Sequence, residues 1–208
     1  MGPPIDETNR RRCASKSRDM RVRTEQQPVR ILAISGSLRR VSSNTALVHA
    51  AAELVPDGVD VRVCTRLADL PLFNPDLDGD SPPAAVVQFR LEIDASNAVL
   101  ISSPEYAHGV PGALKNALDW IVGSGELVGK PVALFNASPR ATHAQASLVE
   151  TLRVMSANVV EDASIAVPLS GRQLDASGIV ADTELSALIQ SALAALAQAA
   201  SSTSAMTN

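Results

Sequence analysis

Apolar runs alternate with amphipathic segments along this chain from residue 29 onward. The runs Val29–Ser35 (VRILAIS), 98–101 (AVLI) and Pro131–Asn136 (PVALFN) are almost continuously apolar, as strands buried on both faces are. A mixed run over 60–65 (DVRVCT) and a less regular one over 158–167 (NVVEDASIAV) complete a set of five predicted strands.

Helical periodicity fills the intervals between these strands. Apolar residues recur at three- and four-residue spacing, which predicts helices over 45–54, 84–95, 110–122 and 144–155 and a terminal helix within 174–198. Asn44 is predicted to cap the first helix, and Pro111 to lie just inside the third. Strands that alternate with helices predict an α/β fold, with a parallel five-stranded sheet and helices on both faces in three layers.

Charge and composition divide the chain unevenly. Residues 1–28 carry seven basic and four acidic groups without apolar periodicity, so we interpret them as a disordered basic leader. The predicted domain spans 29–199, and 200–208 is predicted to be a flexible tail. The chain after the leader is acidic overall, which disfavours nucleic acid as the main partner.

Individual features of the sequence disfavour a metal-binding, disulfide-bonded, membrane-spanning or secreted protein. Cys13 and Cys64 form no metal or disulfide pattern, which favours reduced thiols in the cytoplasm. No apolar run approaches the roughly 20 residues of a membrane span, and the first residues lack the apolar core of a secretory signal. We therefore expect a cytoplasmic protein without a membrane partner. Its core must be aliphatic, because only 2% of the residues are aromatic.

Three polar loops follow predicted strands and precede predicted helices. Parallel strands bring such loops to the carboxyl edge of the sheet, where α/β proteins bind ligands. The loop 36–45 (GSLRRVSSNT) places hydroxyl groups, an arginine and backbone N–H groups at a helix N-terminus, which favours a phosphate site. A capped helix with a solvated arginine is the alternative. The loop matches neither G-x-G-x-x-G nor G-x-x-x-x-G-K.

The second and third loops supply other groups. The loop 104–109 (PEYAHG) holds the single tyrosine of the chain between a proline and a glycine. Beside a phosphate site, we interpret it as binding a flat ring with polar edges. A surface carboxylate is the alternative for Glu105, and a packing residue the alternative for Tyr106. The loop 137–143 (ASPRATH) either joins the same site or is an ordinary polar turn.

The segments SGSLRRVSSNTAL and SPEYAHGVPGALKNALDW, in this order, resemble the two signature loops of the NADPH-dependent FMN reductase family. The resemblance covers about 29–196 and implies a flavodoxin-like fold with FMN and NADPH (or NADH) as cofactors. The residues that it implies around the FMN phosphate are Ser37, Arg39, Ser42, Asn44 and Thr45. The residues that it implies along the flavin ring, chiefly through backbone groups, are Pro104, Glu105, Tyr106 and His108. Ser138 and Arg140 are implied beside the ring and the ribityl chain.

The activity that the resemblance implies is NAD(P)H oxidation with transfer of two electrons to a small acceptor by a ping-pong mechanism. The acceptor classes are quinones, chromate, azo compounds and free flavin, and neither a catalytic side chain nor a metal is expected. A flavodoxin-like electron carrier that does not itself oxidise NAD(P)H is the main alternative, and an FMN-free interaction protein the second. We also expect a homodimer or homotetramer, partly because the apolar segment 67–77 (LADLPLFNPDL) has no obvious place in one compact domain.

Three positions depart from the family pattern. Ser43 stands where an aromatic residue often precedes the asparagine of the first loop, and Ala107 where asparagine commonly follows the Glu-Tyr pair. Pro139 stands in the third loop, where many members have two glycines. We expect these changes to alter contacts to the ring and to leave the phosphate site intact. In the leader, Arg10-Arg11-Arg12 has an alternative role, folding over an anionic site such as the 2′-phosphate of NADPH.

Overall fold

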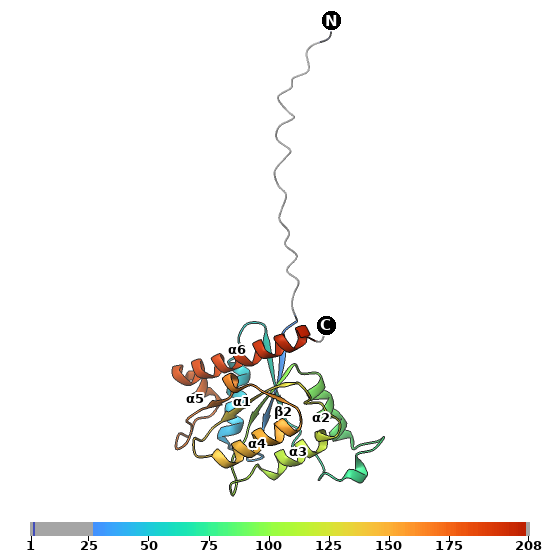
Figure 1. The fold of residues 1–208 in the computed structure, drawn as a ribbon. Helices are drawn as coiled ribbons and strands as arrows, with labels where there is room; N and C mark the ends of the chain where they lie inside the picture. Colours follow the sequence, from blue (N-terminus) through green and yellow to red (C-terminus); the bar gives the residue numbers. More distant parts are fainter. Residues whose placement is uncertain (1, 3–26, 207–208) are drawn as a thin grey trace.

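The computed structural model describes residue 2 and residues 27–206, so the predicted leader lies almost wholly outside the described residues. A parallel sheet forms the centre of the fold (Figure 1), with strand order β2-β1-β3-β4-β5 and a sixth strand, β6, that also pairs with β4. The strands are β1 (Val29–Ser35), β2 (Val59–Cys64), β3 (Ala98–Ser102), β4 (Pro131–Asn136), β5 (Asn158–Val159) and β6 (Ile165–Ala166). The predicted parallel flavodoxin-like sheet is confirmed.

The predicted fifth strand is wrong as a single element. The region 158–167 forms two short strands, β5 and β6, separated by the 3-10 turn η3 (Glu161–Ala163), and both pair with β4. The turn interrupts the ladder, and Ser164 fills the gap: its hydroxyl accepts from the backbone N–H of Leu134 at 3.1 Å and donates to the carbonyl of Val160 at 2.9 Å. A side chain therefore satisfies a β4 donor that an unbroken strand would have paired.

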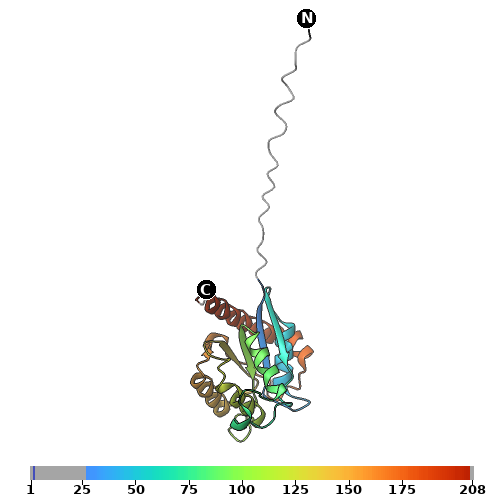
Figure 2. The same ribbon diagram turned by 90° about the vertical axis from the view of Figure 1, so that its right-hand side faces the viewer.

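Helices cover both faces of the sheet, which confirms the three layers (Figure 1 and Figure 2). On one face, the buried aliphatic residues of α1 and α6 pack on the sheet together with α5. On the other face, residues of α2, α3 and α4 form a second core cluster that includes the buried Trp120 of α3. The helices are α1 (Ser43–Glu53), α2 (Ala84–Asp94), α3 (Gly112–Val122), α4 (Thr142–Val154), α5 (Ala176–Ala181) and α6 (Thr183–Met206).

Three predicted helix ends are wrong. Ser42, not Asn44, caps α1, because its hydroxyl accepts from the backbone N–H of Thr45. Pro111 is the capping residue before α3 and not its first residue. The last helix continues to Met206, beyond the predicted domain end at 199, and Ala200 within the predicted tail is 1% exposed.

The last helix also corrects the expectation that no segment approaches a membrane span. Thr183–Thr203 is long and apolar enough to cross a membrane by length and composition. In this structure, however, its apolar stripe is buried against the sheet through Leu185, Ile189, Leu193 and Leu196. A helix that buries one apolar face on a sheet is a core helix of the domain.

The segment 67–77 has a place within the domain, contrary to the expectation from its sequence. Leu67 and Leu70 are buried, and Phe73 packs edge-on against Trp120 with ring centroids 5.1 Å apart. The indole N–H of Trp120 donates to the carbonyl of Pro71 at 2.7 Å, which fixes the segment on α3. Leu72 remains 85% exposed. Leu67, Leu70 and Phe73 therefore have a place in the core of the domain, whereas Leu72 and Leu77 stay exposed.

The first residue after β1, Gly36, lies in close contact with the loop that follows β3. Its backbone N–H donates to the carbonyl of Ser102 at 2.8 Å. A Cβ at this position would lie 2.9 Å from Ser103 Oγ and 3.0 Å from Leu114 Cδ2. A larger residue here would therefore crowd the side chains of Ser103 and Leu114.

We expect Gly36→Ala to lower the free energy of unfolding by about 1–3 kcal/mol, the usual range for overpacking. Gly112→Ala is the matched control, since no atom lies within 4 Å of a Cβ built there. Urea unfolding of both variants checks the difference. Equal stability of the two variants would contradict the steric role of Gly36.

Candidate functional site

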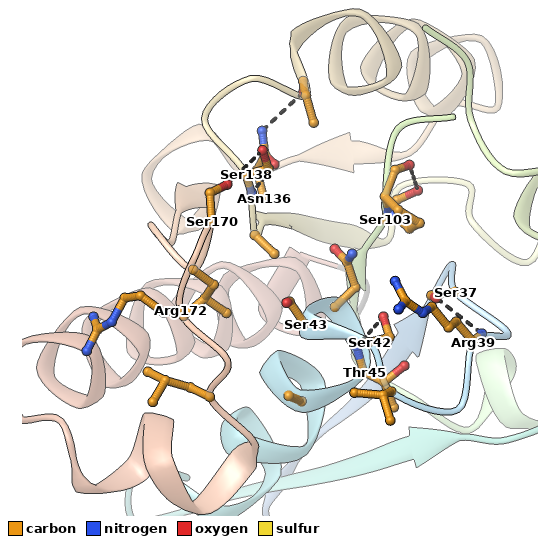
Figure 3. Close-up of a pocket in the computed structure, with 18 of the residues that line it drawn as sticks. Ser37, Arg39, Ser42, Ser43, Thr45, Ser103, Asn136, Ser138, Ser170 and Arg172 are labelled. Carbon is orange, nitrogen blue, oxygen red and sulfur yellow. Dashed lines mark hydrogen bonds between the residues drawn. The ribbon is translucent and has the colours of Figure 1, made fainter. Parts of the chain in front are cut away.

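A cleft of about 1130 Å³ opens at the carboxyl edge of the sheet. Its walls come from the loops after β1, β3 and β4 and from a fourth segment, 169–176, that follows β6. Figure 3 shows side chains from these walls around the opening. Ten of the predicted site residues line it: Ser37, Arg39, Ser42, Asn44, Thr45, Pro104, Glu105, Tyr106, Ser138 and Arg140. The structure therefore brings all three predicted loops into one site.

The first turn of α1 is fixed over the ends of β1 and β3 by two hydroxyl groups. Ser35 and Ser102 are register partners at the ends of these strands. The Ser35 hydroxyl shares a hydrogen bond of 2.9 Å with Thr45 Oγ1, and the Ser102 hydroxyl donates to Asn44 Oδ1 at 2.9 Å. The side chains of Asn44 and Thr45 thus hold the helix in place, although both residues also line the cleft.

The donors that remain for a ligand at this helix end are mainly backbone groups. The N–H groups of Ser43 and Asn44 lie in the first turn, where a helix provides no acceptor for them. The hydroxyls of Ser37 and Ser42 and the exposed guanidinium of Arg39 lie beside them. Backbone donors, hydroxyls and a cation at a helix N-terminus are the groups that bind phosphate in proteins.

The charge of the cleft favours an anion. Among the described residues that line it, arginines outnumber carboxylates. The arginines are Arg39, Arg40, Arg140 and Arg172, and the carboxylates are Glu105 and Asp175. Both carboxylates are bound to backbone N–H groups, Glu105 to that of Ala144 and Asp175 to that of Gly178, each at 2.8 Å. The cationic groups therefore dominate the potential in the cleft.

The loop after β3 forms a tight turn from Tyr106 to Gly109. The backbone groups of these two residues pair with each other, at 3.1 Å and 2.9 Å. Ala107 and His108 occupy the turn with φ angles of 48° and 60°. This left-handed region favours glycine or asparagine, so the backbone is strained at Ala107.

His108, the remaining residue predicted along the flavin ring, is not among the residues that line the cleft. Its ring stacks on that of His143 from the loop after β4, with centroids 4.2 Å apart and planes 20° from parallel. The turn presents His108 toward the neighbouring loop. Its contact therefore joins the two loops.

Glu105 forms a second link between the same two loops. Its Oε2 accepts from the backbone N–H of Ala144 in the first turn of α4, at 2.8 Å. Ala141, the capping residue of α4, has no side-chain cap of its own. Glu105 therefore acts as the N-cap of a helix that belongs to the other loop, and a carboxylate there is also favoured by the helix dipole.

The loop after β4 is connected to the fourth wall. Asn136 Oδ1 accepts from the N–H of Ser138 at 3.0 Å, which shapes the turn. The hydroxyl of Ser170 donates to Ser138 Oγ at 3.1 Å. This bond joins the loop to the segment 169–176. Arg140 is exposed at the same edge.

The sequence analysis missed the fourth wall. It includes Leu169, Ser170, Arg172 and Gln173, none of which was predicted as a site residue. The segment follows a broken strand, so it carried no strand-loop-helix signal. The run of Ser, Gly, Arg and Gln over 170–173 is the polar composition that a site loop shows, and it is the one signal that was present.

Comparison with known proteins agrees with this site. The model of the NADPH-dependent FMN reductase family matches residues 29–171. This chain belongs to that family. It is an oxidoreductase, with FMN and NAD(P)H as its cofactors. All three predicted loops lie within the matched residues, whereas residues 172–176 of the fourth wall lie beyond them.

Individual relatives give the same assignment. An NAD(P)H-dependent FMN reductase from Pseudomonas aeruginosa is 35% identical over 173 residues, which cover 81% of this chain and 93% of the relative. A quinone reductase from Pseudomonas putida is 41% identical over 116 residues, 53% of this chain and 61% of that enzyme. The solved structure of FerB, a flavoenzyme NAD(P)H:(acceptor) oxidoreductase from Paracoccus denitrificans, has a TM-score of 0.66 at 27% identity and covers 83% of this chain and 97% of that one.

We expect Glu105→Ala to destabilise the fold by about 0.5–2 kcal/mol, the usual effect of losing a helix N-cap. Glu105→Gln keeps an acceptor oxygen and should retain most of that stability. Urea unfolding of the FMN-free protein checks this, because it separates the cap from any contact to the cofactor. The same loss in both variants would show that the negative charge, and not the cap, is responsible.

Proposed function

We propose that this reductase passes two electrons from NAD(P)H to a small acceptor by a ping-pong mechanism, with reduced pyridine nucleotide and acceptor using the same open cleft in turn. The acceptor classes are quinones, chromate, azo compounds and free flavin. The observation that carries the proposal is the pairing of an anion site at the first turn of α1 with the two linked loops after β3 and β4 around one cleft.

The residues of the cleft fit FMN. The N–H groups of Ser43 and Asn44, the hydroxyls of Ser37 and Ser42, and Arg39 would hold the phosphate. Backbone groups of 104–106 would border the ring, next to Ser138 and Arg140. These groups are polar, face the same opening and are supported by bonds to the strands beneath them.

Bound FMN supplies the hydride-transfer chemistry, and the protein supplies binding, orientation and electrostatics. The linked loops after β3 and β4 hold the backbone donors in fixed positions, so little reorganisation is needed when negative charge develops beside them. Arg140 adds a positive charge at the same place. No side chain has to act as a nucleophile or as a general base.

The open cleft favours a reductase over an electron carrier. Tyr106 is the one Phe, Tyr or Trp residue among the described residues that line the cleft, and it is 55% exposed. A carrier of the flavodoxin type usually covers its ring with aromatic side chains. An uncovered ring face leaves room for a nicotinamide to stack and for an acceptor to replace it.

Anaerobic mixing with NADPH tests this directly. We expect the flavin absorbance of the purified protein to bleach and to return when a quinone is added, because each half-reaction runs alone in a ping-pong mechanism. Steady-state rates with varied NADPH and quinone should give parallel double-reciprocal lines. Flavin that NADPH and NADH both leave oxidised would identify a carrier, and intersecting lines would exclude ping-pong transfer.

Arg39 is expected to contribute a charge-assisted contact to the phosphate of FMN. Arg39→Ala should weaken FMN binding about tenfold or more, because such contacts contribute about 1.5–3 kcal/mol. Arg62→Ala is the control: it removes an equal charge from an exposed ion pair with Asp60 that does not line the cleft. Flavin fluorescence titration of the FMN-free variants gives both affinities. Unchanged affinity in Arg39→Ala would contradict the phosphate assignment.

Two further expectations stay predictions. A homodimer or homotetramer now rests mainly on the family resemblance, because Leu67, Leu70 and Phe73 of the segment 67–77 pack within the domain. A cytoplasmic location rests on the cysteine pattern. Of the two cysteines, Cys64 is buried and free, and burial raises the pKa of its thiol to about 11. Such a thiol stays protonated at neutral pH and plays no part in the reaction.

A further inference from the structure

The segment 169–176 adds a cationic side chain, Arg172, that the FMN phosphate does not require; the carboxylate on the same wall, Asp175, is bound to the N–H of Gly178. Arg39 lies on the loop after β1, whereas Arg172 lies on the segment 169–176. Figure 3 shows Arg172 on the side of the cleft opposite Arg39, with its side chain directed away from the other labelled side chains. FMN carries a single phosphate group, and the first turn of α1 already provides for it. Arg172 therefore suits another anion.

Two links hold this wall in place. At one end, the hydroxyl of Ser170 donates to Ser138 Oγ at 3.1 Å. At the other end, Arg172 Nη2 donates to Asp182 Oδ2 at 2.6 Å, and Asp182 Oδ1 accepts from the N–H of Leu185 at the start of α6 at 3.1 Å. The wall is thus a supported part of the fold, and its arginine is oriented before any ligand binds.

The guanidinium of Arg172 keeps most of its donors for a ligand. A guanidinium has five N–H donors, and within residues 27–206 its recorded contact is the one to Asp182. The hydrogen bond from Arg172 holds the pKa of Asp182 below its usual range, so the carboxylate stays ionised and keeps the guanidinium in place. A phosphate group can accept from such an arginine through two parallel hydrogen bonds.

The cleft is also large enough for a second ligand. Its volume of about 1130 Å³ exceeds the ~300–1,000 Å³ that is typical of a pocket for one small molecule. A dinucleotide whose nicotinamide lay at the ring-binding loops would place its adenosine end in another part of the opening. The rim that carries Arg172 lies away from the first turn of α1, where FMN would occupy the phosphate site.

We propose that Arg172 binds the 2′-phosphate of NADPH and thereby gives this enzyme a preference for NADPH over NADH. The inference rests on the proposed function, since NADPH and NADH differ by this phosphate group alone. Arg172 lies just beyond the residues that the family model matches, which end at 171. The preference would therefore depend on a part of the chain outside that match.

Binding of two adenosine nucleotides to the FMN-loaded protein tests the proposal without turnover. The probes are 2′,5′-ADP and 5′-AMP, which differ by the 2′-phosphate. By calorimetry, we expect 2′,5′-ADP to bind about tenfold or more tightly than 5′-AMP, the effect of one charge-assisted contact. Arg172→Ala should abolish this difference and leave 5′-AMP unchanged, whereas Arg172→Lys should retain part of it. Arg62→Ala, again the control, should retain all of it.

Kinetics provide the second measurement. Arg172→Ala should raise KM for NADPH about tenfold and leave KM and kcat for NADH unchanged. Equal binding of both probes to the unaltered protein would overturn the proposal. So would a preference that survives in Arg172→Ala or that disappears when residues 1–27 are removed, since the leader arginines would then be responsible. Discrimination through Arg172 without oxidation of either nucleotide would overturn the proposed function alone.

Discussion

The cleft depends on two serine hydroxyls at the ends of adjacent parallel strands. Ser35 ends β1, Ser102 ends β3, and they are register partners. Each is hydrogen-bonded to a side chain in the first turn of α1, one to Thr45 and the other to Asn44. These bonds place the unpaired backbone N–H groups of the helix directly over the sheet edge. A shift in the pairing of β1 with β3 would move that helix end away from the other loops.

Side-chain hydrogen bonds also hold the other walls of the cleft in place. The loops around it have no regular backbone pairing to neighbours, and single side-chain bonds between loops take its place. Glu105 joins the loop after β3 to α4, and Ser138 joins the loop after β4 to Ser170. The side chains that hold the cleft together are thus drawn from the polar residues around the opening, and backbone groups, hydroxyls and arginines are left for ligands. Such preorganisation lets charged ligands bind without ordering the loops first.

The shape and charge of the cleft suit successive small ligands. Four arginines line it, and both carboxylates in the described lining are bound to backbone donors. The single tyrosine of the lining leaves the ring-binding side largely uncovered. An enzyme that must admit a nucleotide and then a different acceptor needs such an opening, whereas a dedicated carrier benefits from a covered ring. The strained turn at Ala107 and His108 stands at the edge of this opening, where the stacked histidines brace it.

The sequence by itself determined the sheet, the order of its elements and the three loops that meet at its edge. Short, continuous apolar runs bounded by turn residues are typical of buried strands, and parallel strands separated by helices place their following loops on one side. Only the tertiary structure decided which partner each polar side chain in these loops binds. The sequence predicted Asn44 and Glu105 as ligand contacts. In the structure, the side chain of Asn44 binds Ser102, and that of Glu105 binds the first turn of α4. His108 turns to His143, and the wall at 169–176 follows a strand that η3 breaks in two. These are long-range contacts between loops, and no local periodicity encodes them, because a polar side chain in a loop can satisfy the backbone of any element that the fold brings beside it.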